Sequence, residues 1–174
     1  MGNLTGGSNT DAFILTGGGS VSVLITGSGG SDTVQGDDLA NTWNLTGAGV
    51  GDVGGSNFTG IENLTGGSNT DNFEFASGSS VSGTVSGGSG GTDTLDYETD
   101  DFNAAVTIDR QNDTATGTGG ITNIDAVVGD SGFNATNVLV GADAANTWNI
   151  TGADDGNIGG TFAFTDMGNL TGGS

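Results

Sequence analysis

The stretch Met1-Gly-Asn-Leu-Thr-Gly-Gly-Ser8 opens the chain and returns unchanged at Met167–Ser174. A longer part of the same phrase, Asn3–Asp11, recurs identically at Asn63–Asp71. Self-similarity at a fixed spacing is typical of repeat proteins, in which each unit needs its neighbours to cover its apolar face. The sequence therefore predicts a single repeat module over residues 1–174, made of one period of about 166 residues and the start of the next.

Composition limits how the chain can fold. Glycine accounts for 37 of the 174 residues, proline and cysteine are absent, and only 32% of the residues are hydrophobic. The absence of cysteine excludes disulfides and thiolate metal sites. So little apolar material suits a thin core repeated along an axis. Disorder is disfavoured, because the apolar residues are β-branched or aromatic and recur at regular intervals.

The charge is one-sided, with 21 acidic residues against a single cation, Arg110, and a net charge of -20. Such a surface repels phosphate backbones and anionic lipids, so we expect neither a nucleic-acid partner nor membrane insertion. Met1 is not followed by the basic and apolar segments of a signal peptide. Because Met1 aligns with Met167, we expect the chain to come from a longer protein whose targeting signal lies elsewhere.

Short strand-like runs alternate with Gly, Ser, Asn and Asp turns, and no window has the spacing of an amphipathic helix. A step of about 30 residues relates these runs. Apolar residues then form columns: Leu4, Val34, Leu64, Leu95 and Ile124; Phe13, Trp43 and Phe73; and Leu15, Leu45 and Phe75.

This pattern predicts an all-β chain folded as a right-handed parallel β-solenoid (β-helix), with roughly 30 residues and three short strands per coil. The step fails after Ile124, since Leu139 follows only 15 residues later. We therefore expect an irregular coil or a protruding loop near 111–140. The alternative is that each 30-residue coil is two shorter coils.

Several segments approximate the nonapeptide GGxGxDxUx, in which U is a large apolar residue: Gly27–Gln35, Gly66–Glu74 and Gly88–Asp96. At these residues the chain resembles haemolysin-type (repeats-in-toxin) calcium-binding repeats. Ile121–Asp125 and Gly132–Gly141 are similar to segments of giant secreted bacterial adhesin-like proteins. The resemblance implies an extracellular or cell-surface location and calcium as the one candidate cofactor.

Calcium sites of that family need consecutive nonapeptides, and this chain departs from the pattern because Asn41 stands nine residues after Asp32. A second route is a polar column at the 30-residue step, formed by Asp11, Asn41, Asp71 and Asp101. The candidate calcium ligands are thus Asp11, Asp71, Asp101, Asp32 and Asp93. The alternative, which we prefer, is that these side chains cap turns and need no cofactor.

Two further sets of residues have structural interpretations. Asn3, Asn63 and Asn169 share one position of the repeated phrase, which predicts a ladder of stacked amides. Trp43 and Trp148 could serve as sugar-stacking platforms, but their alignment with Phe13 and Phe73 favours a place in the core.

Side chains suited to catalysis are scarce, because the chain has no His, Lys or Cys. The adjacent acids Asp37-Asp38, Asp100-Asp101 and Asp154-Asp155 are candidates for glycoside hydrolysis. Adjacent residues on a strand point to opposite faces, however, so we expect no enzyme. Ice binding is also disfavoured, because Gln35 interrupts the row that Thr5 and Thr65 begin.

We expect a structural tandem-repeat module of an extracellular bacterial fibre or giant adhesin. Its partners would be copies of itself stacked end to end into a rod or filament, with any cell-surface or carbohydrate ligand bound elsewhere in the full protein. An end strand exposes unpaired backbone groups, which a neighbouring repeat can cover. The alternative is a calcium-stiffened spacer or adhesion segment of a haemolysin-type secreted protein.

Overall fold

The computed structural model describes residues 3–22 and 24–173, and in this part of the chain it contains β-strands and a single turn of 3-10 helix, η1 (Ser131–Phe133), but no α-helix. Met1, Gly2 and Ser174, which belong to the repeated phrase, lie outside the described residues. No helix here is long and apolar enough to cross a membrane. The strands are β1 (Leu4–Gly7), β2 (Ala12–Ile14), β3 (Leu24–Ser28), β4 (Thr33–Gln35), β5 (Asn41–Gly47), β6 (Val50–Val53), β7 (Ser56–Thr59), β8 (Asn63–Gly67), β9 (Asp71–Phe75), β10 (Thr84–Gly88), β11 (Thr94–Asp96), β12 (Thr107–Asp109), β13 (Thr114–Ala115), β14 (Gly120–Thr122), β15 (Ala126–Val128), β16 (Val138–Val140), β17 (Trp148–Ile150), β18 (Gly156–Ile158), β19 (Phe162–Thr165) and β20 (Asn169–Thr171).

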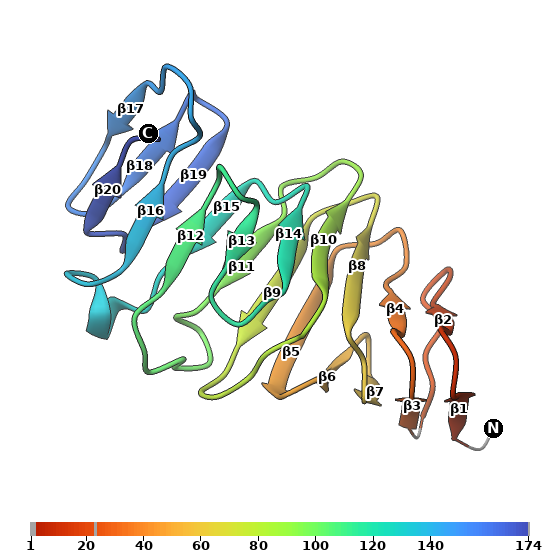
Figure 1. Ribbon diagram of the computed structural model, residues 1–174. Coiled ribbons are helices and arrows are strands. Elements are labelled where there is room, and N and C mark those ends of the chain that lie inside the picture. The colour runs from red at the N-terminus through yellow and green to blue at the C-terminus, as the bar shows by residue number, and fades with distance from the viewer. Residues whose placement is uncertain (1–2, 23, 174) are drawn as a thin grey trace.

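The strands form largely parallel sheets that the chain visits in alternation. An 11-stranded sheet has the order β1-β3-β7-β6-β5-β9-β11-β15-β19-β18-β17. The strands between its members belong to a five-stranded sheet, β14-β10-β8-β4-β2, and a four-stranded sheet, β13-β12-β16-β20. Figure 1 shows these two shorter sheets following one another along one side of an elongated molecule, with the N- and C-termini at opposite ends.

The parallel pairs correct the predicted 30-residue columns in part. Val34 pairs with Leu64 and Trp43 pairs with Phe73, as the step requires. Leu4 pairs instead with Ile25, in a different sheet from Val34. The shortest separation in sequence between paired residues of parallel strands is therefore 21 or 22 residues. The same separation relates Asp11 to Asp32 and Asp71 to Asp93, which are joined by hydrogen bonds. Such a step holds two strands, one in each facing sheet, and not the three that were expected.

Other predicted members of the columns also have different neighbours. Phe13 pairs with Val34, and Leu95 pairs with Phe73 and Val127. Ile124 lies between β14 and β15, outside any strand. The paired columns are Leu4, Ile25 and Phe58; Phe13, Val34, Leu64, Val85 and Ile121; Trp43, Phe73, Leu95, Val127 and Phe164; and Ile108, Leu139 and Leu170.

Antiparallel excursions lengthen some steps to 30 residues or more. In the first, the chain runs forward to β5 and returns through β6 and β7, so that β7 lies beside β3 and β5 lies beside β9. Strands β17, β18 and β19 repeat this arrangement. The predicted irregular region near 111–140 contains the antiparallel strand β13, which pairs with β12, and η1. The sequence repeat of 30 residues thus mixes two different steps.

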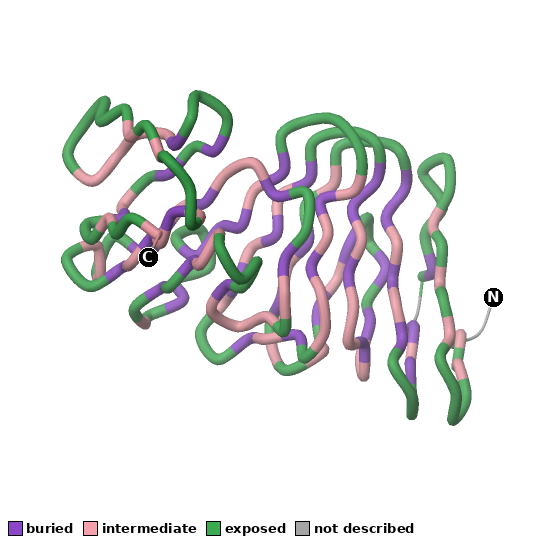
Figure 2. The backbone as a smooth tube through the Cα atoms, turned by 45° about the horizontal axis from the view of Figure 1, so that its top comes forward, coloured by how far each residue is buried: buried purple, intermediate pink, exposed green. Residues whose placement is uncertain are grey.

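The core is the narrow space between the facing sheets. Alternate residues of a strand point to opposite faces, so each short strand contributes one to three side chains to this space. In β9, for example, Asp71, Phe73 and Phe75 are buried while the residues between them are half-buried. Figure 2 shows buried segments along the middle of the strands, with exposed segments at the turns and at both ends of the molecule. The core is therefore open at each end.

Candidate functional site

The last four strands repeat an arrangement already present in the interior. Trp43 of β5 pairs with Val53 of β6, and Trp148 of β17 pairs with Ile158 of β18. The ring of Trp43 lies 6.3 Å from that of Phe58, and the ring of Trp148 lies 6.2 Å from that of Phe164. Strands β5–β8 are therefore a structural template for β17–β20, whose last member carries the octapeptide that also begins the chain.

Close contacts that the two units share support their equivalence. An added Cβ on Gly51 would lie 2.3 Å from the carbonyl oxygen of Asn44, and one on Gly156 would lie 2.3 Å from that of Asn149. No side chain fits at such a separation, so both positions require glycine. The Asn44 amide donates to Asp52 at 3.0 Å, and the Asn149 amide donates to Asn157 at 2.9 Å.

What differs between the two units is the strand beyond them. In the interior, β9 pairs in parallel with β5, which places Phe73 beside Trp43 and Phe75 beside Leu45. The Trp43 and Phe73 rings are stacked with centroids 5.4 Å apart. At the C-terminal end, the described residues supply β17 with no partner except β18. The edge that β9 covers on β5 is open on β17.

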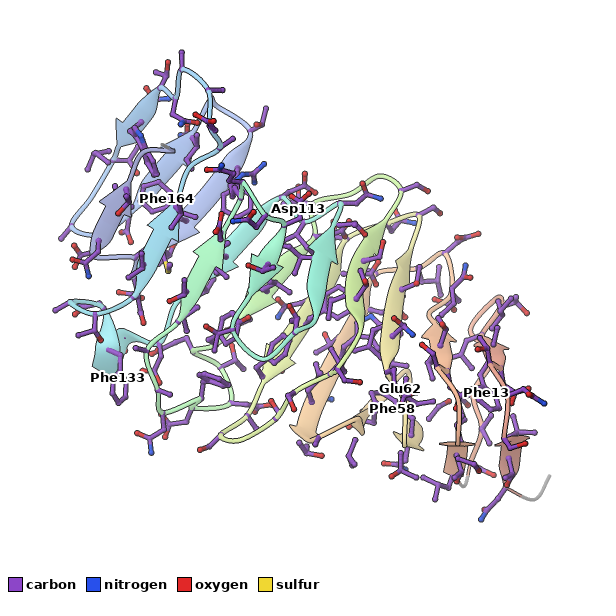
Figure 3. The ribbon with its side chains drawn as sticks, viewed as in Figure 1. Phe13, Phe58, Glu62, Asp113, Phe133 and Phe164 are labelled. Atoms are coloured by element: carbon purple, nitrogen blue, oxygen red, sulfur yellow. The ribbon has the colours of Figure 1, made fainter. Side chains whose placement is uncertain are left out.

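The opposite end of the molecule has the matching strand. Asp11, Phe13 and Leu15 follow the repeated phrase as Asp71, Phe73 and Phe75 do. Within the described residues, β2 pairs only with β4 and β1 pairs only with β3. Figure 3 shows Phe13 near one end of the molecule and Phe164 near the other.

Burial shows the consequence of the open edges. In the interior, Trp43, Leu45, Leu64, Phe73 and Phe75 are all 0% exposed. Their counterparts at the ends are less covered: Ile150 is 58% exposed, and Leu4, Phe13, Leu15, Trp148 and Leu170 are half-buried. The two ends thus leave apolar side chains exposed where the interior buries the equivalent ones. We call these surfaces the leading face (β1 and β2) and the trailing face (β17).

Four of the five predicted calcium ligands lie in two ladders, in which most steps are a backbone N–H donating to the carboxylate of the next residue in the ladder. In one, the N–H of Asp11 donates to Asp32 at 2.8 Å, and the N–H of Asp32 donates to Glu62 at 2.8 Å. The second ladder joins Asn41, Asp71, Asp93 and Asp125.

In this second ladder the Asn41 amide donates to Asp71 at 3.0 Å. The N–H of Asp71 then donates to Asp93 at 2.8 Å, and that of Asp93 to Asp125 at 3.1 Å. Asp101 does not take part, because it lies exposed in a separate turn with φ 58°. The predicted column of Asp11, Asn41, Asp71 and Asp101 is therefore split among different ladders and turns.

Asp71 also closes its own turn, which explains the glycines that precede it. The N–H of Gly67 donates to Asp71 Oδ2 at 2.8 Å. An added Cβ on Gly66 would lie 2.3 Å from that oxygen and 2.2 Å from the Gly87 carbonyl oxygen. The pairs Gly27 with Asp32 and Gly87 with Asp93 have the same close approach. The Gly-rich motif is thus needed for turn capping and close stacking.

A hollow beside β10 and β11 lies on the second ladder. It is lined by the turn residues 88–91 with Asp93, Asn123 and Asp125. Burial, and less strongly the charges of Asp71 and Asp125, raise the pKa of Asp93 from 3.8 to about 6, although the Asp71 N–H opposes the shift. In the described residues no three His, Cys, Asp or Glu side chains are placed to hold a metal ion together.

The predicted asparagine ladder does not form, because its members lie in different sheets. The Asn63 amide donates to Ser31 at 3.0 Å and to the Asp32 carbonyl at 3.3 Å. The Asn169 amide donates to the carbonyls of Ala135 at 2.8 Å and Asn137 at 3.2 Å. Asn3 stands before β1 in the 11-stranded sheet. The side chains of Asn63 and Asn169 therefore bond to neighbouring turns and not to another Asn.

Neither a protein-family model, nor a curated protein, nor a solved structure matches the chain. What the protein does must therefore be inferred from its own residues.

Sequence reasoning missed several residues of these sites, including Glu62 and Asp125 of the ladders and Ile150 of the trailing face. A signal for the last was present, because Gly141–Gly160 matches Gly36–Gly55 without a gap. That alignment makes Ile150 the counterpart of the buried Leu45.

Proposed function

We propose that this chain is a right-handed parallel β-solenoid module that works as a structural tandem repeat of an extracellular bacterial fibre or giant adhesin. Its role is mechanical and not catalytic: the trailing face of one copy joins the leading face of the next and extends a rod. The observation that supports this proposal is the difference in burial between equivalent residues, such as Leu45 at 0% and Ile150 at 58% exposed.

The interior supplies a template for the joint. Superposing β5 and β9 on β17 and the β2 of a following copy pairs Trp148 with Phe13 and Ile150 with Leu15. The same superposition places the amide of Asn146 against the carboxylate of Asp11, as Asn41 lies against Asp71. Aromatic stacking, apolar burial and a polar contact would all form in one register.

Charge explains why the polar contact matters. With a net charge of -20, two copies repel each other, and two facing aspartates would add to this repulsion. The template places a neutral amide opposite Asp11 instead. The joint therefore avoids a like-charge pair at the point of contact.

Size-exclusion chromatography with light scattering tests the proposal. We expect wild-type chains to associate end to end at high concentration, and Ile150→Asp to weaken association at least tenfold. Burying one such side chain contributes roughly 1.5–3 kcal/mol, which corresponds to a factor of ten or more. Val50→Asp is the matched control, because Val50 is 36% exposed and lies in β6, which has a paired strand on each side and is far from either end of the sheet.

A wild-type chain that stays monomeric at high protein concentration, and in enough salt to screen the charge repulsion, would refute end-to-end stacking. An equal loss of association in Val50→Asp and Ile150→Asp would show that general hydrophobicity, and not the trailing face, drives it.

A calcium-stiffened spacer is the second candidate, supported by the hollow at Asp93, Asn123 and Asp125 and by the raised pKa of Asp93. A bound cation would remove the cost of ionising that buried carboxyl group. Calcium should then raise the melting temperature saturably, and more than an equal ionic strength of sodium does. Asp125→Asn should abolish the difference between the two salts.

A further inference from the structure

The two copies of the octapeptide lie at opposite ends of the molecule, and the strand of each has one of the two partners of the interior strand that shares the sequence Asn-Leu-Thr. The interior strand β8 pairs with β4 through Leu64 and Val34, and with β10 through Leu64 and Val85. Strand β20 pairs with β16 alone, through Leu170 and Leu139. Strand β1 pairs with β3 alone, through Leu4 and Ile25, among the residues that the structure describes.

Hydrogen bonds show that β20 sits on β16 as β8 sits on β4. The Asn63 N–H donates to the carbonyl of Asp32 at 2.9 Å, and the Asn169 N–H donates to that of Asn137 at 3.0 Å. The side-chain amides of Asn63 and Asn169 donate to the same two carbonyls at 3.3 and 3.2 Å. Strand β20 therefore occupies one half of the interior environment of this sequence, and β1 occupies the other half.

We infer that β20 holds the place on β16 that β1 of a following copy takes, so that two separate copies join by strand exchange. The inference rests on the end-to-end stacking proposed above and adds how it is controlled. In the joint, a single copy of the octapeptide lies between β16 of one chain and β3 of the next. It then has both partners of β8.

The connection between strands explains why one copy has to leave. In the joint, β2 of the following chain lies on β17, as β9 lies on β5. A short turn joins β1 to β2, and Asp11 closes it by packing against Gly6. Docked β2 therefore brings its own β1 to the edge of β16, where β20 already lies. The two identical strands compete for Leu139 and for the carbonyl of Asn137.

This competition predicts opposite effects for one substitution made in two copies of one sequence. In the 174-residue chain, Leu170→Asp weakens the pairing of β20 with Leu139 and frees the site. We expect it to strengthen end-to-end association at least tenfold. Leu4→Asp places a charge in the strand that must enter the site, and we expect it to weaken association at least tenfold. Association constants from light scattering or analytical ultracentrifugation measure both.

A second pair of substitutions is milder, so that the ends of the molecule stay folded. Asn169→Ala removes the side-chain bonds of β20 to Ala135 and Asn137 but keeps its leucine, and Asn3→Ala is its counterpart directly before β1. Asn169→Ala should strengthen association and Asn3→Ala should weaken it. Circular dichroism and melting curves of each variant confirm that the rest of the molecule is folded.

Crosslinking tests the register of the joint directly. The chain has no cysteine of its own, so only introduced cysteines react. Thr42 pairs with Asn72 in the interior, so Thr147 should lie beside Ala12 of the following copy. Thr147→Cys and Ala12→Cys chains, both carrying Leu170→Asp, should be joined by a short bis-maleimide. Thr147→Cys with Thr84→Cys is the control and should not crosslink, because β10 lies three strands further in than β2 and adjacent strands are about 4.8 Å apart.

The outcomes separate this inference from the proposed function. If wild type and all variants stay monomeric, end-to-end stacking itself fails. If wild type associates and Leu4→Asp and Leu170→Asp weaken it equally, the copies stack without exchange and the inference is wrong. If neither substitution changes association, the inference is wrong as well, and the joint lies elsewhere.

Discussion

Glycine next to an aspartate-closed turn is the residue-scale feature on which the close stacking of this molecule depends. Gly66 lies under Asp71 and against the carbonyl of Gly87 in the following strand. Any side chain there would push apart both the turn and the neighbouring strand. The Gly-x-x-x-x-Asp spacing is therefore a packing requirement, whether or not an ion is bound.

We expect Gly66→Ala to lower the free energy of unfolding by about 1–3 kcal/mol, because its Cβ would overlap two oxygen atoms. Gly47→Ala is the control, since the nearest atom to its Cβ would be Cβ of Val50 at an ordinary 3.6 Å. Urea unfolding of both variants measures the difference. A Gly66→Ala protein as stable as Gly47→Ala would contradict the role assigned to this glycine.

The raised pKa of Asp93 predicts how stability depends on pH. The pKa of this carboxyl group is about 6 in the folded protein and about 3.8 when unfolded, so the folded state binds the proton more readily. Its ionisation therefore costs stability above pH 6, and this cost vanishes as the pH falls towards 4. Stability should rise between pH 7 and pH 5.

Asp93→Asn removes this titration while keeping an oxygen for the Asp71 N–H. We expect it to raise stability at pH 7 by about 1–3 kcal/mol and to flatten the pH dependence. Asp109→Asn is a contrast, because hydrogen bonds, chiefly from the side chain of Asn112, lower the pKa of Asp109. Loss of the Asp109 carboxylate should reduce stability at neutral pH. Melting curves from pH 4 to pH 8 test both, and an unchanged slope in Asp93→Asn would exclude the assignment.

At the scale of elements, equivalent strands with different neighbours provide a comparison within one chain. Trp43 is buried between β7 and β9, with Phe58 on one side and Phe73 on the other. Trp148 lies in the same local sequence and touches Phe164, but its other side has no covering strand among the described residues. The sequence Asn-Thr-Trp-Asn is therefore in a core at one position and on a surface at the other.

We expect Trp43→Ala to destabilise the isolated chain by about 3–5 kcal/mol and Trp148→Ala by about half of this or less. Guanidinium unfolding at low protein concentration measures both. The cost of Trp148→Ala should grow as concentration rises, because association buries that side chain. Equal costs at low concentration would mean that the trailing face is already as well covered as the interior.

At the scale of the whole molecule, charge and apolar ends act in opposite directions. Each copy carries a net charge of -20, which repels a second copy over distances comparable to the Debye length, while only short apolar faces attract it. We therefore expect association to strengthen as sodium chloride rises from about 0.01 M to 0.5 M, where the Debye length falls from about 30 Å to a few Å. Light scattering at fixed protein concentration tests this. Association that weakens with salt would point to charge pairing and against an apolar joint.

Part of this architecture could be predicted from the sequence alone. Short apolar runs between Gly-rich turns indicated an all-β chain with parallel strands, and repeated phrases indicated equivalent units. The pairs Val34 with Leu64 and Trp43 with Phe73 followed from spacing. These features are local: alternation and turn chemistry act over a few residues, so they can be seen in a linear sequence.

The strand order depended on the tertiary structure. Where the chain inserts an antiparallel excursion, the distance between paired residues changes from 21 or 22 to 30 or more, and a fixed step assigns Leu4 to Val34 in place of Ile25. Two identical octapeptides also acquired different partners, β3 in one case and β16 in the other. The physical reason is that backbone pairing in a sheet is decided by which edge is free when strands meet, and identical sequences cannot encode different edges.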